Sequence, residues 1–246
     1  MKVMTISGPP SSGKTSVALK VAPALSATYR LAVAKFDCLT SRDAPLYEAA
    51  GLPVVAGVSG ALCPDHFFAT NMAGCMDWAQ RQEADVLLVE SAGLCNRCAP
   101  HLRDAVAVCV IDVLAGIDAP RKVGPMLRLA DFVVVTKADL VSQPEREVFA
   151  LNVVRANPRA HVLFVNGLTG QGACMFESAL LEALAHASDN PHTLRFTMPG
   201  AVCSYCFGET GLGTKHASGN IKYMDFPDEK PVAPAAVHAN REGRPR

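Results

Sequence analysis

A glycine-rich loop near the N-terminus constrains this chain more than any other feature. Residues 8–15 read Gly-Pro-Pro-Ser-Ser-Gly-Lys-Thr and follow a short apolar run, Val3–Ser7. This spacing of two glycines, a lysine and a threonine is that of a phosphate-binding P-loop, which lies between a strand and the start of a helix. Backbone N–H groups and the helix N-terminus of such a loop bind phosphate oxygens. The pattern therefore predicts a P-loop NTPase.

Each residue of the loop has a predicted role. We expect Lys14 to meet the β- and γ-phosphate oxygens and the Thr15 hydroxyl to hold Mg²⁺. A chance glycine-rich turn is the alternative, and the complete pattern in its expected context argues against it. Further nucleotide contacts are predicted from the neighbouring residues Gly8, Pro9, Pro10, Ser11, Ser12, Gly13 and Ser16.

The rest of the chain alternates between apolar runs and helical patterns. Further strands are predicted at 31–36, 86–90, 106–112, 132–136 and 162–165, and helices at 14–27, 66–82, 120–129, 145–156 and 173–187. Most of the runs are rich in Val and Ile, which is typical of central parallel strands. The alternation predicts an α/β fold with a doubly wound, mostly parallel sheet.

The pattern changes near Asp189. A chain of 246 residues suits one ordinary α/β domain with an appendage. We assign residues 1–190 to the P-loop domain and residues 191–226 to a small Cys- and Gly-containing segment that metal binding would order. Residues 227–246 are rich in Pro, Ala and charge, and we expect a disordered tail there.

A second motif, Thr136-Lys137-Ala138-Asp139, follows an apolar strand. An ionised aspartate at this place accepts two hydrogen bonds, which suits the N1 and N2 groups of guanine, while the lysine stem packs on the base. P-loop GTPases read guanine through an Asn-Lys-x-Asp motif. Thr136 replaces the asparagine here, and a threonine can still bridge loops by hydrogen bonding. The motif favours guanine over adenine.

Two acidic residues at strand ends are candidates for the magnesium site. Glu90 ends a buried strand, and its carboxylate is expected to bind Mg²⁺ through water. Gly93 is placed to sense the γ-phosphate by its backbone N–H. Asp37 ends the second strand and either completes the magnesium site or orients the attacking water; a capping role in a turn is the alternative. Together with Lys14, these two carboxylates form the predicted catalytic set.

Bulk properties exclude several functions. Lys plus Arg equals Asp plus Glu, so the formal net charge is zero and nothing indicates a nucleic-acid surface. The N-terminus leads straight into a strand and lacks the features of a signal peptide. The longest apolar run, around 105–111, is too short to span a membrane. We expect a cytoplasmic protein.

Nine cysteines are many for such a chain. Their odd number and a reducing compartment argue against a disulfide framework. Four lie in two Cys-x-x-Cys pairs, Cys95/Cys98 and Cys203/Cys206, for which metal binding is the leading interpretation and reduced thiols are the alternative. The pairs form either one four-cysteine site or two sites. An all-thiolate set suits zinc or an iron–sulfur cluster.

Several short stretches together carry a resemblance to known proteins. They are residues 90–93 (Glu-Ser-Ala-Gly), 111–116 (Ile-Asp-Val-Leu-Ala-Gly), 120–122 (Pro-Arg-Lys), 124–125 (Gly-Pro), 130–131 (Ala-Asp) and 136–139 (Thr-Lys-Ala-Asp). Over about residues 1–187 the sequence resembles the urease-maturation GTPase UreG, and the hydrogenase-maturation GTPase HypB is similar in layout. The resemblance implies a SIMIBI-class GTPase that hydrolyses GTP with Mg²⁺, dimerises across the nucleotide and handles a metal for a client metalloenzyme or accessory maturation proteins.

The resemblance also implies a transition-metal site. Cys63-Pro64-Asp65-His66 is similar to the Cys-Pro-His motif of the urease GTPase with one residue, Asp65, inserted. Cys95 lies where the hydrogenase relative carries a metal cysteine, and Cys98 and His101 are additional candidates. Thiolate and imidazole suit Zn²⁺ or Ni²⁺. The alternatives are a buried thiol in a helix-start turn for Cys63 and His66, and a surface or capping histidine for His101.

Three functions compete at this point. The leading one is a GTP-dependent metallochaperone. The second is a nucleotide-dependent iron–sulfur electron donor of related fold. The third is a small-molecule kinase, against which the motif at 136–139 argues because kinases do not need that base reader.

Overall fold

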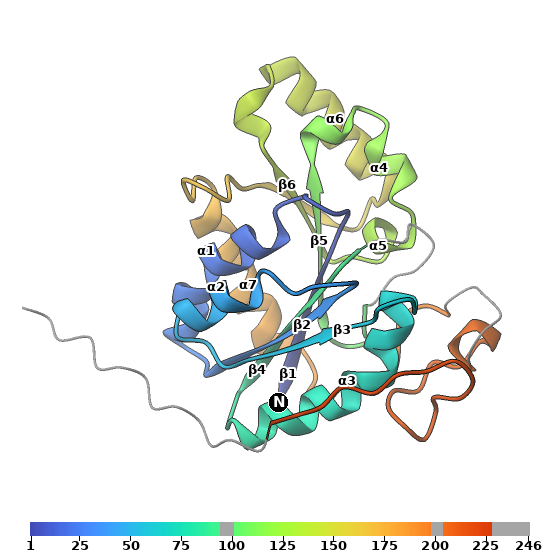
Figure 1. Ribbon diagram of the computed structural model, residues 1–246. Coiled ribbons are helices and arrows are strands. Elements are labelled where there is room, and N and C mark those ends of the chain that lie inside the picture. The colour runs from blue at the N-terminus through green and yellow to red at the C-terminus, as the bar shows by residue number, and fades with distance from the viewer. Residues whose placement is uncertain (94–100, 198–203, 228–246) are drawn as a thin grey trace, which may run out of the picture.

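A parallel sheet forms the centre of the molecule (Figure 1). The computed structural model describes residues 1–93, 101–197 and 204–227, with the side chains of 206 and 207 outside that description. Its seven strands pair in parallel in the order β3-β2-β4-β1-β5-β6-β7. They are β1 Lys2–Ser7, β2 Leu31–Asp37, β3 Val54–Val58, β4 Val86–Ser91, β5 Val106–Asp112, β6 Phe132–Thr136 and β7 His161–Phe164. The predicted α/β fold class is confirmed.

Helices cover both faces of the sheet, because side chains alternate between the two faces along each buried strand. On one face, Met4 and Ile6 of β1 pack with α1 and α7; on the other, Val3 packs with α3. Farther along that second face, β5 and β6 pack against α4, α5 and α6. The helices are α1 Lys14–Ser26, α2 Ala44–Ala49, α3 Pro64–Arg81, α4 Ala119–Lys122, α5 Pro125–Arg128, α6 Gln143–Ala156 and α7 Ala173–His186, with 3-10 turns at Val113–Ala115, Ala138–Leu140 and Ser204–Phe207.

Three elements differ from the predictions. The edge strand β3 and the short helix α2 were not predicted. The single helix expected over 120–129 is wrong, because the chain breaks at Gly124, whose φ of +68° a helix cannot contain, and restarts at Pro125.

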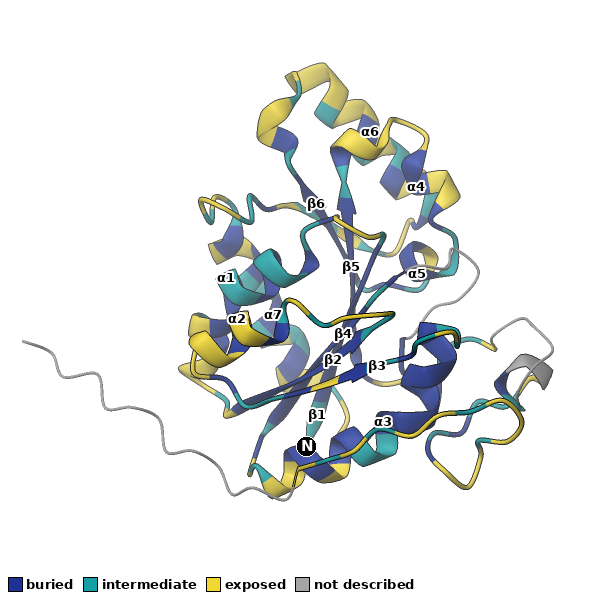
Figure 2. Ribbon diagram, in the orientation of Figure 1, coloured by how far each residue is buried: buried dark blue, intermediate teal, exposed yellow. Residues whose placement is uncertain are grey.

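The chain after Asp189 runs back over the domain. Leu194 and Tyr205 are fully buried in the core cluster that contains α3, and Met224 and Phe226 pack against it. The amide side chain of Asn71 on α3 donates to the carbonyl of Lys222 and accepts from the N–H of Met224. Figure 2 shows this segment lying along the buried α3. Residues 204–227 therefore use the domain core rather than a core of their own.

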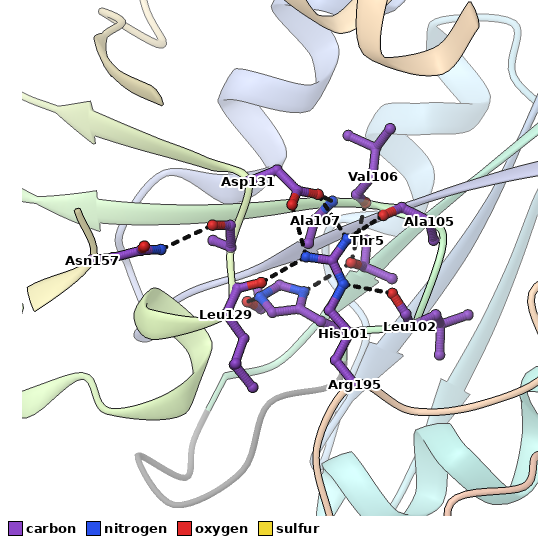
Figure 3. A network of polar contacts seen from close by, with 12 residues as sticks. Thr5, His101, Leu102, Ala105, Val106, Ala107, Leu129, Asp131, Asn157 and Arg195 are labelled. Atoms are coloured by element: carbon purple, nitrogen blue, oxygen red, sulfur yellow. Dashed lines mark hydrogen bonds and ion pairs between the residues drawn. The ribbon is translucent and has the colours of Figure 1, made fainter. Parts of the chain in front are cut away.

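Arg195 fixes the start of this segment at the amino-terminal ends of β5 and β6 (Figure 3). Its guanidinium makes a two-point ion pair with Asp131, with both N···O distances at 2.8 Å. It also donates to the carbonyls of Leu102, Leu129 and Ala105. A planar five-donor group suits this arrangement, which satisfies backbone carbonyls from two different loops at once.

Candidate functional site

The P-loop joins β1 to α1 at the carboxyl edge of the sheet, where a doubly wound fold binds its ligand. Two glycines let it pack closely. A Cβ on Gly93 would collide with the carbonyl oxygen of Gly8, and a Cβ on Gly8 would collide with that of Val110. A cleft of about 740 Å³ opens beside the loop. It is lined by residues of the loop and by Lys35, Asp37, Asp43, Glu90 and Lys137.

Lys14 is buried under the loop. Its ammonium donates to the carbonyls of Gly8 at 3.0 Å, Pro9 at 2.9 Å and Ala92 at 3.5 Å. Burial lowers the pKa of Lys14, and the nearby positive charge of Lys35 lowers it further, against the opposing effect of Glu90. These partners are neutral carbonyl oxygens, which anionic phosphate oxygens can replace with stronger, charge-assisted bonds.

The Thr15 hydroxyl lies at the centre of a carboxylate cluster. It is 2.9 and 3.1 Å from the two oxygens of Glu90 and 3.1 Å from Oδ2 of Asp43. Asp37 ends β2 beside them, and its buried Oδ2 has no hydrogen-bond partner in the described part of the chain. The structure thus brings together the three predicted magnesium residues, Thr15, Asp37 and Glu90. It adds Asp43, which sequence reasoning missed.

Two further residues of this cluster were also missed. The ammonium of Lys35, on β2, is 2.7 Å from Glu90 Oε1 and 3.3 Å from each of Asp37 and Asp43. The phenol of Tyr47, on α2, donates to Glu90 Oε2 at 2.6 Å. Burial and the charge of Glu90 raise the pKa of Tyr47 above its usual range, so its hydroxyl stays a donor. The sequence held a signal for Lys35, which is a lysine inside an otherwise apolar strand, two residues before an aspartate.

The predicted base-reading motif lies on the other side of the P-loop. The Thr136 hydroxyl donates to the carbonyl of Ser12 at 2.7 Å, and Lys137 donates to the carbonyl of Ser11 at 3.1 Å and pairs with Asp112. Asp139 is exposed. The motif therefore fixes the outer turn of the P-loop and leaves one carboxylate facing solvent beside it.

Cys63 and His66 lie at the start of α3. Cys63 is the N-cap residue and His66 follows within the first turn; the thiol is half-buried and the imidazole is buried. Both line a cavity of about 160 Å³, whose opposite wall is Asn220, Ile221 and Lys222. Among the described residues, no group of three or more His, Cys, Asp or Glu side chains is arranged to hold a metal ion.

The other predicted metal ligands cannot be placed. Cys95, Cys98 and Cys203, and the side chain of Cys206, lie outside the described residues. His101 is fully buried: Nδ1 is 2.8 Å from the Thr5 hydroxyl and Nε2 is 2.9 Å from the carbonyl of Met126 (Figure 3). Because a carbonyl only accepts, Nε2 carries the proton and Nδ1 accepts from Thr5. Both ring nitrogens are occupied, so the metal and surface interpretations of His101 are wrong.

The fold and this edge of the sheet define a P-loop NTPase. The nucleotide-binding domain of the CobW/HypB/UreG family matches residues 2–164, and the chain belongs to that family. It is 41% identical over 226 residues to an uncharacterized protein of Methanocaldococcus jannaschii, a match that covers 92% of this chain and 97% of that protein.

Two solved structures share the fold. The hydrogenase maturation factor HypB from Archaeoglobus fulgidus has a TM-score of 0.60 at 21% identity, covering 75% of this chain and 90% of that one. HypB from Helicobacter pylori, solved in complex with nickel, has a TM-score of 0.61 at 21% identity and covers 77% and 91%. In the described ranges, none of the helices has the length and apolarity needed to cross a membrane.

Proposed function

We propose that this protein is a GTP-hydrolysing metallochaperone that assists metal insertion into a client enzyme. The observation that carries the proposal is the convergence of Lys14, Thr15, Asp37 and Glu90 on one cleft at the carboxyl edge of the sheet. Membership of the family supports the nucleotide and the maturation role.

The residues present fit a magnesium ion. Hard oxygen donors gather at Thr15, Glu90 and Asp37, and the buried Oδ2 of Asp37 lacks a hydrogen-bond partner within the described ranges. Mg²⁺ favours sites with one or two carboxylates, water and substrate phosphates. When bound, it neutralises charge on the phosphate oxygens.

In the proposed hydrolysis, water attacks the γ-phosphorus and the bond to the β-phosphate oxygen breaks, giving GDP and inorganic phosphate. Lys14 meets the β- and γ-phosphate oxygens, and Asp37 orients the water or holds the metal. Gly93, packed on the P-loop, offers its N–H to the γ-phosphate. On the other side of the loop, Asp139 selects guanine.

The proposed cargo is a transition metal at Cys63 and His66. A thiol and an imidazole on one helix turn suit Ni²⁺ or Zn²⁺, and a fold neighbour, HypB from Helicobacter pylori, was solved with nickel. Two ligands leave positions for others, either from Cys95 and Cys98 or from a second copy of the chain in a nucleotide-dependent dimer. Nothing in the described residues or in the comparisons favours the iron–sulfur alternative.

A comparison of GTP and ATP tests the nucleotide assignment. We expect slow, Mg²⁺-dependent hydrolysis of GTP, and none for Lys14→Ala, which removes the charge that meets the phosphates. Asp139→Ala should weaken GTP binding by about 100-fold, because two hydrogen bonds to a charged acceptor are lost, with ATP binding little changed. Calorimetric titration and phosphate release measure these effects.

The matched control is Asp118→Ala. Asp118 is an exposed aspartate directly before α4, and its side chain makes no capping hydrogen bond. It should leave both affinities unchanged. Equal binding of ATP and GTP by the unaltered protein would overturn the guanine assignment.

A further inference from the structure

Lys35 places an ammonium group inside the predicted magnesium site. Its side chain is 2% exposed, and it lies within 3.3 Å of carboxylates from three different elements: Asp37 at the end of β2, Asp43 before α2 and Glu90 on β4. A buried lysine is tolerated only when acidic partners compensate for its lost hydration. Here the carboxylates surround the ammonium.

The ammonium and the Thr15 hydroxyl share the same acceptors. Both contact Oε1 of Glu90, at 2.7 and 2.9 Å, and both contact Oδ2 of Asp43, at 3.3 and 3.1 Å. A divalent ion held by Thr15 and these carboxylates therefore has Lys35 as its direct neighbour. Two positive charges at such a separation repel strongly in a buried site.

We propose that Lys35 is a positioning residue that takes the place of a divalent cation in the nucleotide-free protein. Its ammonium holds Asp37, Asp43 and Glu90 together, and it repels free Mg²⁺ until the phosphates of a nucleotide supply compensating negative charge. Magnesium then enters with the nucleotide rather than ahead of it. This inference rests on the proposed nucleotide site.

The charges of the cluster support this order of binding. Three carboxylates contact the ammonium of Lys35, the charge of Lys14 acts on Glu90 and Asp37 from nearby, and Tyr47 adds a neutral donor to Glu90. The acids are thus largely compensated, which leaves little attraction for an additional dication. A bound triphosphate adds several negative charges and reverses that balance.

Mn²⁺ is the probe for the experiment, because its electron paramagnetic resonance signal reports free and bound metal without any turnover. The unaltered protein, purified free of nucleotide, should bind no Mn²⁺ below about 1 mM and should bind it tightly once GDP is added. Lys35→Met removes the repelling charge. It should bind Mn²⁺ at least about 10-fold more tightly in the absence of nucleotide.

Nucleotide affinity supplies the second readout. In EDTA, Lys35→Met should bind GDP several-fold more weakly, because the phosphates lose an attractive charge. In excess Mg²⁺ the difference in GDP affinity between the two proteins should shrink. Lys35 attracts the phosphates but repels the Mg²⁺ that binds with them, so the two effects of removing its charge oppose each other. Lys35→Arg keeps the charge and should keep the weak Mn²⁺ binding of the unaltered protein.

Three outcomes would overturn the proposal: micromolar Mn²⁺ binding by the unaltered, nucleotide-free protein; no gain in Mn²⁺ affinity for folded Lys35→Met; or the same gain for Lys35→Arg. If Lys35→Met does not fold, Lys35→Gln, which can still donate to Glu90, replaces it in the titration. Failure of the proposed function looks different. It appears as no binding of GTP or ATP, whereas the Mn²⁺ comparison is made without nucleotide.

Discussion

His101 shows how one buried side chain links pH to stability. Burial lowers the pKa of His101 to about 4, from an ordinary value of 6.5. The folded protein therefore holds the ring neutral, while the unfolded chain takes up a proton below about pH 6.5. The stabilisation is complete above pH 6.5 and is lost as the pH falls toward 4, by ~3 kcal/mol in total.

Urea unfolding at pH 7 and at pH 4.5 measures this loss. His101→Gln disturbs the hydrogen bonds to Thr5 and Met126, so the variant should be less stable than the unaltered protein at pH 7. Because glutamine cannot take up a proton, the variant should then lose less stability on acidification. An identical pH dependence in both proteins would show that other groups cause the acid sensitivity.

At the same scale, sequence reasoning found the residues that motifs define and missed those that only the fold assembles. Thr15 and Glu90 were predicted from a loop pattern and a strand end, and the structure puts them in contact. Tyr47 lies in a helix of six residues, α2, that carries no motif, and Asp43 is the residue before that helix. Only the fold brings Tyr47 to Glu90 and Asp43 to Thr15. Lys35 stands out as a charged residue in a buried strand, but its shortest contact is to Glu90, which is 55 residues away in the sequence.

At the scale of elements, the ring of Phe226 in the C-terminal segment packs directly against Gly74 of α3. A Cβ at Gly74 would lie 2.5 Å from the Phe226 ring, so the ring must move if the glycine is replaced. Gly→Ala inside a helix normally stabilises by ~1 kcal/mol. We expect Gly74→Ala to give no gain in the unaltered chain, but to give about that gain when Phe226→Ala is also present.

Urea unfolding of the two single variants and the double variant completes this cycle. The double variant is the control for helix propensity, since it keeps the alanine and removes the clash. Equal effects of Gly74→Ala in both backgrounds would mean that the Phe226 ring does not pack against Gly74 in solution.

The elements that the sequence did not predict are short or interrupted. β3 has five residues at the edge of the sheet, and its Val-Val-Ala-Gly-Val run is too brief to establish a period. The long, strongly patterned elements, α1, α7 and the central strands, were predicted within one or two residues, because buried parallel strands give near-continuous apolar runs.

At the scale of the whole molecule, the nucleotide cleft and the proposed cargo site are joined by neighbouring strands. The N–H of Ser59 donates to the carbonyl of Asp37 at 2.9 Å, and that of Gly60 donates to the carbonyl of Cys38 at 2.7 Å. Cys63 follows three residues later. Backbone hydrogen bonds thus connect Asp37 with the loop that leads to the start of α3.

We therefore predict that Ni²⁺ or Zn²⁺ affinity differs by about 10-fold between the GDP-bound protein and the protein with a non-hydrolysable GTP analogue, and that the metal changes nucleotide affinity by the same factor. Cys63→Ser should lose this difference while keeping nucleotide affinity without metal. Cys174→Ser, at an exposed thiol on the opposite face, is the control. Identical metal affinity in both nucleotide states would show that nucleotide binding and metal binding are not coupled.

The wall that Asn220, Ile221 and Lys222 add to the cavity beside Cys63 and His66 has a consequence for biosynthesis. A ribosome releases the chain from its N-terminus, so all seven strands and α3 emerge before this wall does. During that interval this wall cannot yet cover the thiol and the imidazole. The cavity is complete only once residues 220–222 have been translated and have packed beside the start of α3.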